Sequence, residues 1–129
     1  MSDDPDIDEL LSILYHSLRA TRRRYVIQLL ERDNRRVVTT RELARKIASL
    51  ELKVPEQQAT GEPYRNAYNA LSQTHLPTLS DAGIIIYDSE RQVVTSGDNF
   101  DLATLLIDTN SSTVHVFSSL VEGTDRSEE

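Results

Sequence analysis

The stretch NALSQTHLPTLSDAGIIIYDSERQVV, residues 69–94, decides the fold. Its first part continues a helix that begins near Pro63, a residue suited to a first helical turn, and that Pro77 ends or kinks. A short packed turn follows, and Gly83 closes it in the manner of a C-cap. Two strands then follow, at 84–87 and at 92–95, and residues 88–91 form the turn between them. The stretch therefore predicts a helix followed by a β-hairpin.

Two helices are predicted near the N-terminus. Apolar residues recur at helical spacing over 7–18, directly after Asp6, which forms a capping-box pattern with Glu9. This apolar stripe consists of Ile7, Leu10, Leu11, Leu14, Tyr15 and Leu18. A second helix begins after Thr21 and runs to about Arg32. Its buried side consists of Tyr25, Val26, Leu29 and Leu30.

A short strand and a third helix follow. Residues 37–39 are few and β-branched, so they predict only a small strand. Thr39 then caps a helix, because Glu42 stands three residues further on. The buried face of this helix consists of Leu43, Ala44, Ile47 and Ala48. Proline, glycine and glutamine residues mark 53–62 as the loop that leads to the next helix.

The helix that begins near Pro63 has an apolar and a polar side over residues 63–75. The inner side repeats at helical spacing and consists of Tyr64, Ala67, Tyr68, Leu71 and His75. The outer side consists of Arg65, Asn66, Asn69, Ser72 and Gln73. No acidic residue occurs over 63–80, although 21 of the 129 residues are acidic. This absence favours an anionic partner for the outer side over a plain solvated face.

A last helix is predicted over 99–108, with Asp98 as its cap. Its inward side consists of Leu102, Leu105 and Leu106. Residues 113–121 are compatible with a strand or a short helix, and we favour the helix. The chain therefore divides into four parts. An acidic tail, 1–6, precedes one domain, 7–108, and an extension, 109–121, and a disordered acidic tail, 122–129, follow it.

The expected order of elements is α-α-β-α-α-β-β-α, which is mainly helical with a small antiparallel β-hairpin. This is the order of a winged helix-turn-helix. Its third and fourth helices would form the helix-turn-helix, and the hairpin would form the wing.

The composition limits both the core and the chemistry. A chain of 129 residues with 38% hydrophobic residues supports one modest core. It contains no cysteine, so disulfides, cysteine-ligated metals and thiol nucleophiles are excluded. The histidines are too scattered for a metal site, and phosphate-loop, nucleophile-elbow and zinc-protease motifs do not occur. We therefore expect no enzyme, no cofactor and no small-molecule effector.

The chain carries no sequence signal for a membrane. It has no run of about 20 apolar residues, and its N-terminus lacks the basic and apolar parts of a signal peptide. We therefore expect a soluble, cytoplasmic protein with no membrane partner.

The net charge of -7 conceals a strong polarisation. Residues 19–46 contain ten basic and three acidic residues, a local charge of +7. The first turn of the second helix contains Arg22, Arg23 and Arg24, where the helix macrodipole disfavours positive charge. A compensating anion is therefore expected there, either from the protein or from outside. Acidic flanks with 12 Arg against 2 Lys are typical of a salt-saturated cytoplasm, where net charge says little about DNA binding.

Two segments carry a family resemblance. The stretch 69–94, together with SLRATRRRYVIQLL at 17–30, resembles the small winged-helix domains of halophilic archaea. More distantly, it is similar to arsenic-repressor-type transcriptional regulators. The resemblance covers about residues 7–108, and the Q-T-H-L-P run at 73–77 is its most specific part. It implies a winged-helix fold and DNA-binding regulation, often by a dimer, with a structural role for His75.

These observations predict a sequence-specific DNA-binding transcriptional regulator that is homodimeric through its first and last helices. Asn and Gln bond adenine and Arg bonds guanine, so the outer side of the recognition helix, 63–75, would contact bases of double-stranded DNA. The base-contact candidates are Arg65, Asn66, Asn69, Ser72 and Gln73. The backbone-contact candidates are Arg22, Arg23, Arg35, Arg36, Arg41, Arg45, Lys46 and Arg91.

The predicted wing departs from a strong DNA-binding pattern. Its tip contains Asp88 and Glu90, and only Arg91 offsets them, which argues against insertion into a minor groove. An alternative function therefore stays open, in which the winged helix is an adaptor that binds proteins and not DNA.

Overall fold

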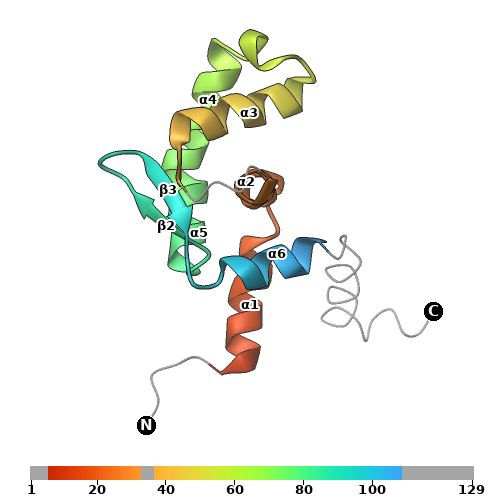
Figure 1. The fold of residues 1–129 in the computed structure, drawn as a ribbon, viewed down its shortest axis with the longest axis vertical. Helices are drawn as coiled ribbons and strands as arrows, with labels where there is room; N and C mark the ends of the chain where they lie inside the picture. The colour runs from red at the N-terminus through yellow and green to blue at the C-terminus, as the bar shows by residue number, and fades with distance from the viewer. Residues whose placement is uncertain (1–5, 33–36, 109–129) are drawn as a thin grey trace, which may run out of the picture.

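The computed structural model describes residues 6–32 and 37–108. The predictions for the extension at 109–121 and the tail at 122–129 lie outside these ranges. Within them, the elements follow the predicted order (Figure 1), except that the segment predicted as a loop, 53–62, contains a short 3-10 helix. The helices are α1 (Ile7–Ser17), α2 (Thr21–Arg32), α3 (Thr40–Leu52), η1 (Glu56–Gln58), α4 (Glu62–Ala70), η2 (Leu71–His75), α5 (Leu76–Asp81) and α6 (Phe100–Asp108). The strands are β1 (Val37–Thr39), β2 (Ile85–Asp88) and β3 (Val93–Ser96).

The strands form one antiparallel sheet in the order β1-β3-β2. The short strand β1 therefore extends the predicted hairpin to three strands, with Val38 opposite Val94. Both hairpin strands begin one residue later than predicted. The turn includes Gln92, whose φ of 56° lies in the left-handed region and is incompatible with a strand.

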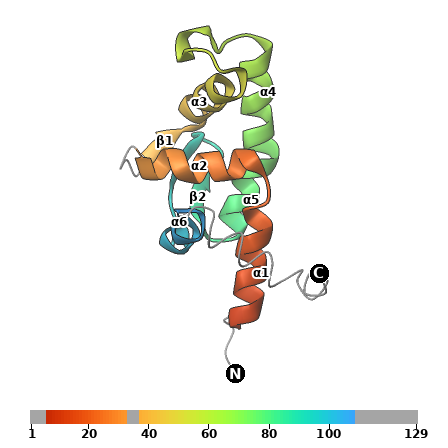
Figure 2. The ribbon, with the colours of Figure 1, turned by 90° about the vertical axis from the view of Figure 1, so that its right-hand side faces the viewer.

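Helices contact this sheet at both of its edge strands, α3 at β1 and α5 at β2. Figure 1 shows α3 and α4 side by side at one end of the molecule, with the β2–β3 wing projecting beside them. In Figure 2, α2 crosses the middle of the molecule, between α3 and α6. The protein is thus a mainly helical domain with the layout of a winged helix-turn-helix, as the sequence predicts.

Pro77 does not end the fourth helix. The helical backbone continues from α4 through η2, a π-helical turn, into α5, which contains Pro77 in its first turn. Proline has no N–H, so the carbonyl four residues earlier loses its usual partner, and a local π turn accommodates this break. The helix finally stops at Gly83, whose φ is +75°.

The core lies where α2, α3, α5 and the inner face of the sheet meet. Its largest fully buried side chains include Leu14, Ile27, Leu43, Ile47, Leu71, Leu76, Leu79, Ile84 and Ile85. Two predictions about buried faces are wrong in part. Ile7 is 67% exposed, because the first turns of α1 extend beyond the other helices, and Leu105 is 57% exposed, since Ala103, Leu106 and Ile107 form the inward side of α6.

Local hydrogen bonds explain where the helices begin. The Asp6 side chain accepts from the Glu9 backbone N–H at 2.7 Å, and Thr39 and Glu42 form the predicted capping box. The last helix starts at Phe100, one residue later than predicted, so Asn99 and not Asp98 precedes it. The side chain of Asn99 donates to the Ala82 carbonyl at 2.9 Å, which ties α6 to the end of α5.

Candidate nucleic-acid interface

The predicted base-contact residues share one surface of α4 and η2. Arg65, Asn66, Asn69 and Gln73 are all exposed. Ser72 is half-buried, and its hydroxyl donates to the backbone carbonyl of Asn69 at 3.4 Å. Four of the five candidate side chains are therefore accessible to a ligand, while the Ser72 hydroxyl has a backbone partner.

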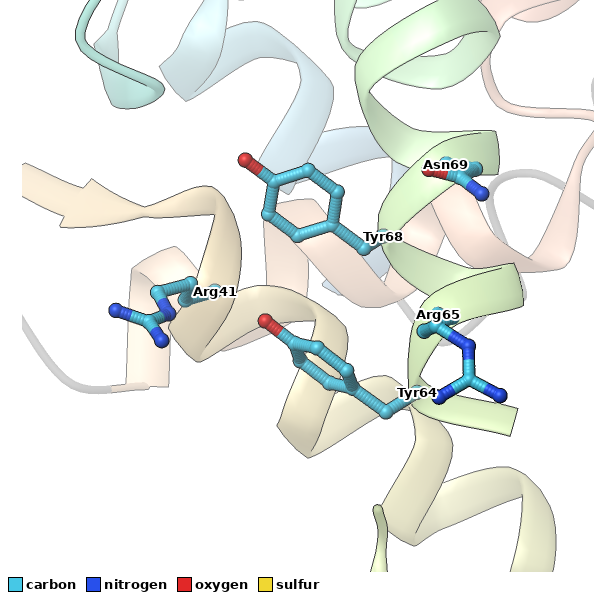
Figure 3. A pocket seen from close by; sticks show the side chains of 5 residues that line it. All are labelled: Arg41, Tyr64, Arg65, Tyr68 and Asn69. Atoms are coloured by element: carbon cyan, nitrogen blue, oxygen red, sulfur yellow. The ribbon is translucent and has the colours of Figure 1, made fainter. Parts of the chain in front are cut away.

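A shallow hollow lies between the start of α3 and the first half of α4 (Figure 3). It has a volume of about 400 Å³ and is lined by Arg41, Tyr64, Arg65, Tyr68 and Asn69. Sequence reasoning places both tyrosines on the inner side of the helix. In the structure they are half-buried, with ring centroids 6.1 Å apart, and they pack against the core only in part. The polar hydroxyl of tyrosine was the available signal, because it favours a position at the edge of a core.

The basic residues of α3 divide into two groups. Arg41 and Arg45 lie one helical turn apart and are exposed, and neither forms an ion pair within residues 6–32 and 37–108. Lys46 differs, because its Nζ lies 3.3 Å from Oε2 of Glu56 in η1. A second hollow, of about 380 Å³, lies beside this pair and is lined by Arg45, Glu56, Gln57 and Thr60. Arg41 and Arg45 are thus the free cations of this helix in the described part of the chain.

The first turn of α2 has its compensating anion inside the protein. The Arg22 guanidinium makes two bonds to the Glu51 carboxylate at the end of α3, at 2.7 and 2.8 Å. This pairing raises the pKa of Arg22 above its ordinary value. Arg24 donates to the backbone carbonyls of Leu18 and Arg19, which end α1. Both side chains therefore hold helices together, which argues against Arg22 as a phosphate contact.

Arg23 and His75 lie where α2 packs against η2. Nε of Arg23 and Nδ1 of His75 are buried and have no hydrogen-bond partner among the described residues. Burial lowers the pKa of Arg23 and of His75, and the Arg23 and Arg22 guanidiniums lower the pKa of His75 further, whereas Glu51 raises it. Arg23 therefore serves the α2–η2 contact more than an external phosphate.

The wing is fixed to the start of α3. The side-chain carbonyl of Gln92 accepts from the Thr40 hydroxyl at 2.7 Å and from the Tyr87 hydroxyl at 3.0 Å. Sequence reasoning assigned no such role to Gln92. At the tip, one Asp88 oxygen accepts the backbone N–H groups of Glu90 and Arg91, both at 3.1 Å. Asp88 thus shapes the turn.

The remaining candidates differ in what the structure says of them. Arg91 is exposed, and its Nε lies 4.0 Å from the second Asp88 oxygen. Arg35 and Arg36 lie outside the described residues.

In the described part of the chain, no group of three or more His, Cys, Asp or Glu residues could hold a metal ion. Nor does that part contain a helix long and apolar enough to cross a membrane.

Fold and surface together define a winged helix-turn-helix domain with a polar, arginine-bearing face on α3 and α4. The chain belongs to the family described as a domain of unknown function (DUF7344), whose model matches residues 15–95. The match extends from the last residues of α1 into β3, so it includes the helix-turn-helix and the wing. No curated protein and no solved structure matches the chain.

Proposed function

We propose that this protein is a sequence-specific, double-stranded-DNA-binding transcriptional regulator, with α4 and η2 as its recognition helix. The helix-turn-helix layout supports the proposal, because such folds place the exposed side of this helix in a major groove. The resemblance to winged-helix domains of halophilic archaea agrees with it. The chain would act in a salt-rich cytoplasm, with no cofactor and no catalytic activity.

One observation carries the proposal. Arg41, Arg45 and Arg65 have no ion-pair partner among the described residues, whereas Arg22 and Lys46 do. The three unpaired guanidiniums lie on α3 and α4, the two helices that a helix-turn-helix presents to DNA. Between them, exposed amides on α4 and η2 offer the donor and acceptor pairs that match adenine. An interface with an anionic, base-bearing partner accounts for both features.

The proposed roles follow from the positions of the side chains. Arg65, Asn66, Asn69 and Gln73 would read base edges, and Arg41 and Arg45 would hold phosphates beside them. Ser72 contributes less, because its hydroxyl already has a backbone partner. The wing would stay outside the minor groove and contact the backbone through Arg91 alone.

The test is fluorescence anisotropy with promoter-length duplexes at molar potassium chloride, where short-range contacts dominate over counterion release. The wild type is compared with Asn69→Ala/Gln73→Ala. We expect the wild type to prefer some duplexes and the variant to lose that preference, because both amides are base readers. Gln58→Ala, which removes an exposed amide from η1, is the control and should keep the preference. If the wild type binds no duplex, or if both proteins bind every duplex alike, base readout by this helix is wrong.

A protein-binding adaptor is the second candidate, and one observation favours it. Val37 is 56% exposed and Ile86 is 61% exposed, and both flank Thr95 on the outer face of the sheet. Such apolar positions suit a protein partner better than a phosphate backbone. A partner captured from a nuclease-treated lysate, and lost on Val37→Ser/Ile86→Ser, would favour this candidate.

We also propose a homodimer through α1 and α6. Exposed apolar side chains on α1 support it, since Ile7 is 67% exposed and Ile13 is 38% exposed. A second copy would bury them, and two-fold symmetry would then match a palindromic site. Light scattering at micromolar concentration is expected to give twice the chain mass, and a monomer mass would contradict the dimer.

A further inference from the structure

The hollow beside α4 has two differently equipped sides. In Figure 3 the hydroxyl groups of Tyr64 and Tyr68 extend toward the side of Arg41, whereas Arg65 and Asn69 extend from the other side of α4. This divergence follows from helix geometry, because each residue is rotated by about 100° from its predecessor. The tyrosines thus present a separate surface from the proposed base readers.

The donors on the tyrosine side are unused within the protein. Among residues 6–32 and 37–108, neither tyrosine hydroxyl makes a hydrogen bond and the Arg41 guanidinium has no ion pair. Both rings are half-buried and pack against the core, so the two hydroxyls are held in place by ring contacts. Tyrosine has few rotatable bonds, and binding through it therefore costs little conformational entropy.

The chemistry of the lining selects an anion. None of the five residues that line the hollow is acidic, and Arg41 brings a positive charge to the tyrosine side. Phosphate oxygens accept from guanidinium groups and from hydroxyl groups alike, which is the donor set on the tyrosine side. The hollow is also open and shallow, which suits one phosphate of a long polymer better than an enclosed small molecule.

We propose that Arg41, Tyr64 and Tyr68 form a subsite for one backbone phosphate of duplex DNA. This inference rests on the proposed function. The bound phosphate would fix the register at which Arg65 and Asn69 meet the bases. The phosphate is held where α3 and α4 meet, so the subsite sets the angle of α4 in the groove. Neither tyrosine is a base reader, and their effect on affinity is independent of sequence.

The test uses a mixed-sequence duplex of about 20 base pairs, roughly two helical turns. Binding is measured by anisotropy for the wild type and for Tyr64→Phe/Tyr68→Phe, which keeps the rings and removes only the hydroxyls. We expect about tenfold weaker binding of the variant, with an unchanged salt dependence, because no charge is lost. Tyr25→Phe, on α2, removes a hydroxyl outside the hollow and should bind like the wild type. Circular dichroism confirms that all proteins are folded.

Single methylphosphonate linkages locate the contact. Each replaces one charged phosphate with a neutral group, and one or two positions should weaken the wild type while having less effect on the double Phe variant. If the wild type binds the duplex and the Phe variant binds equally well, the subsite is wrong and the proposed function stands. If the wild type binds no duplex, both fail.

Inorganic phosphate separates a polymer subsite from a small-ligand pocket. Isothermal titration calorimetry is the readout, because its heat signal does not depend on the tyrosines that the variant replaces. Titration with inorganic phosphate alone should give no saturable change. A saturable change that is lost in Tyr64→Phe/Tyr68→Phe would overturn DNA as the occupant.

Discussion

The fold uses two groups of arginines differently, one at the start of α2 and the other on α3 and α4. Both groups lie in or near the same basic region. Arg22 is bonded to Glu51 and Arg24 to the carbonyls that end α1. Arg41 and Arg65 line a hollow and have no ion pair among the described residues. The first group joins helices to one another. The second group is available to a partner.

This difference separates two meanings of a basic cluster. A charge that finds its partner within the fold contributes to stability and gives no phosphate contact. A charge without such a partner stays hydrated until a ligand replaces the water. Substitutions in the two groups should therefore have different effects, and equal effects would show that the groups are interchangeable.

The largest effect is expected on DNA binding. Arg41→Gln/Arg65→Gln should weaken binding to a preferred duplex about 100-fold, because each contact contributes about 1–3 kcal/mol. The thermal midpoint should not change, since both side chains are exposed. Anisotropy measures the first quantity and calorimetry the second. The control Arg19→Gln/Arg32→Gln removes the same charge from exposed positions around α2, and an equal loss there would show that only net charge matters.

The second effect is on stability. Arg24→Ala removes the donors to the Leu18 and Arg19 carbonyls and should lower the free energy of unfolding by about 1–2 kcal/mol. Urea unfolding measures this loss. The folded variant should bind DNA like the wild type. An unchanged urea midpoint would refute the role of Arg24 at the end of α1.

A smaller effect is expected for the ion pair. The side chains of Arg22 and Glu51 are 27% and 35% exposed, so their coupling should be below about 1 kcal/mol. A double-mutant cycle with Arg22→Gln and Glu51→Gln measures it, at low and at high salt. The coupling should decrease as the salt concentration rises. A coupling of zero at low salt would mean that the pair does not hold α2 against α3.

The smallest effect is a pH dependence of stability. The pKa of His75 in the folded protein lies below its ordinary value of 6.5, so the unfolded chain takes up the proton first as the pH falls. Stability is therefore full above about pH 6.5 and decreases between 6.5 and the lower folded pKa. His75→Gln should remove this decrease in the urea midpoint, while the exposed His16→Gln should keep it. The same decrease in both variants would assign it to other groups.

Local patterns predict the elements of this fold well. The capping pair Thr39 and Glu42 and the C-cap Gly83 determine helix ends from a few neighbouring residues, and both occur as predicted. The exposure of Arg65 and Asn69 also follows from helical spacing. These features depend on contacts within about one turn of helix, which the sequence displays directly.

Other features depend on contacts between distant segments. The partner of Arg22 is 29 residues away, and no local pattern connects the two. The π turn before Pro77, the position of Gln92 in the turn and the hollow at Tyr64 likewise depend on how whole elements pack. Sequence reasoning therefore found the candidate surface but could not tell its free arginines from the engaged ones.

The salt dependence of DNA binding tests the central claim most directly. The logarithm of the association constant is measured against the logarithm of the salt concentration, for the wild type and for single Gln variants of Arg22, Arg41, Arg45 and Arg65. We predict that the slope decreases by about 0.9 for Arg41→Gln and for Arg45→Gln, since each loses one phosphate contact, and by less for Arg65→Gln, which loses a base contact. The slope stays unchanged for Arg22→Gln. Equal slopes for all four variants, or a decrease only for Arg22→Gln, would contradict the account.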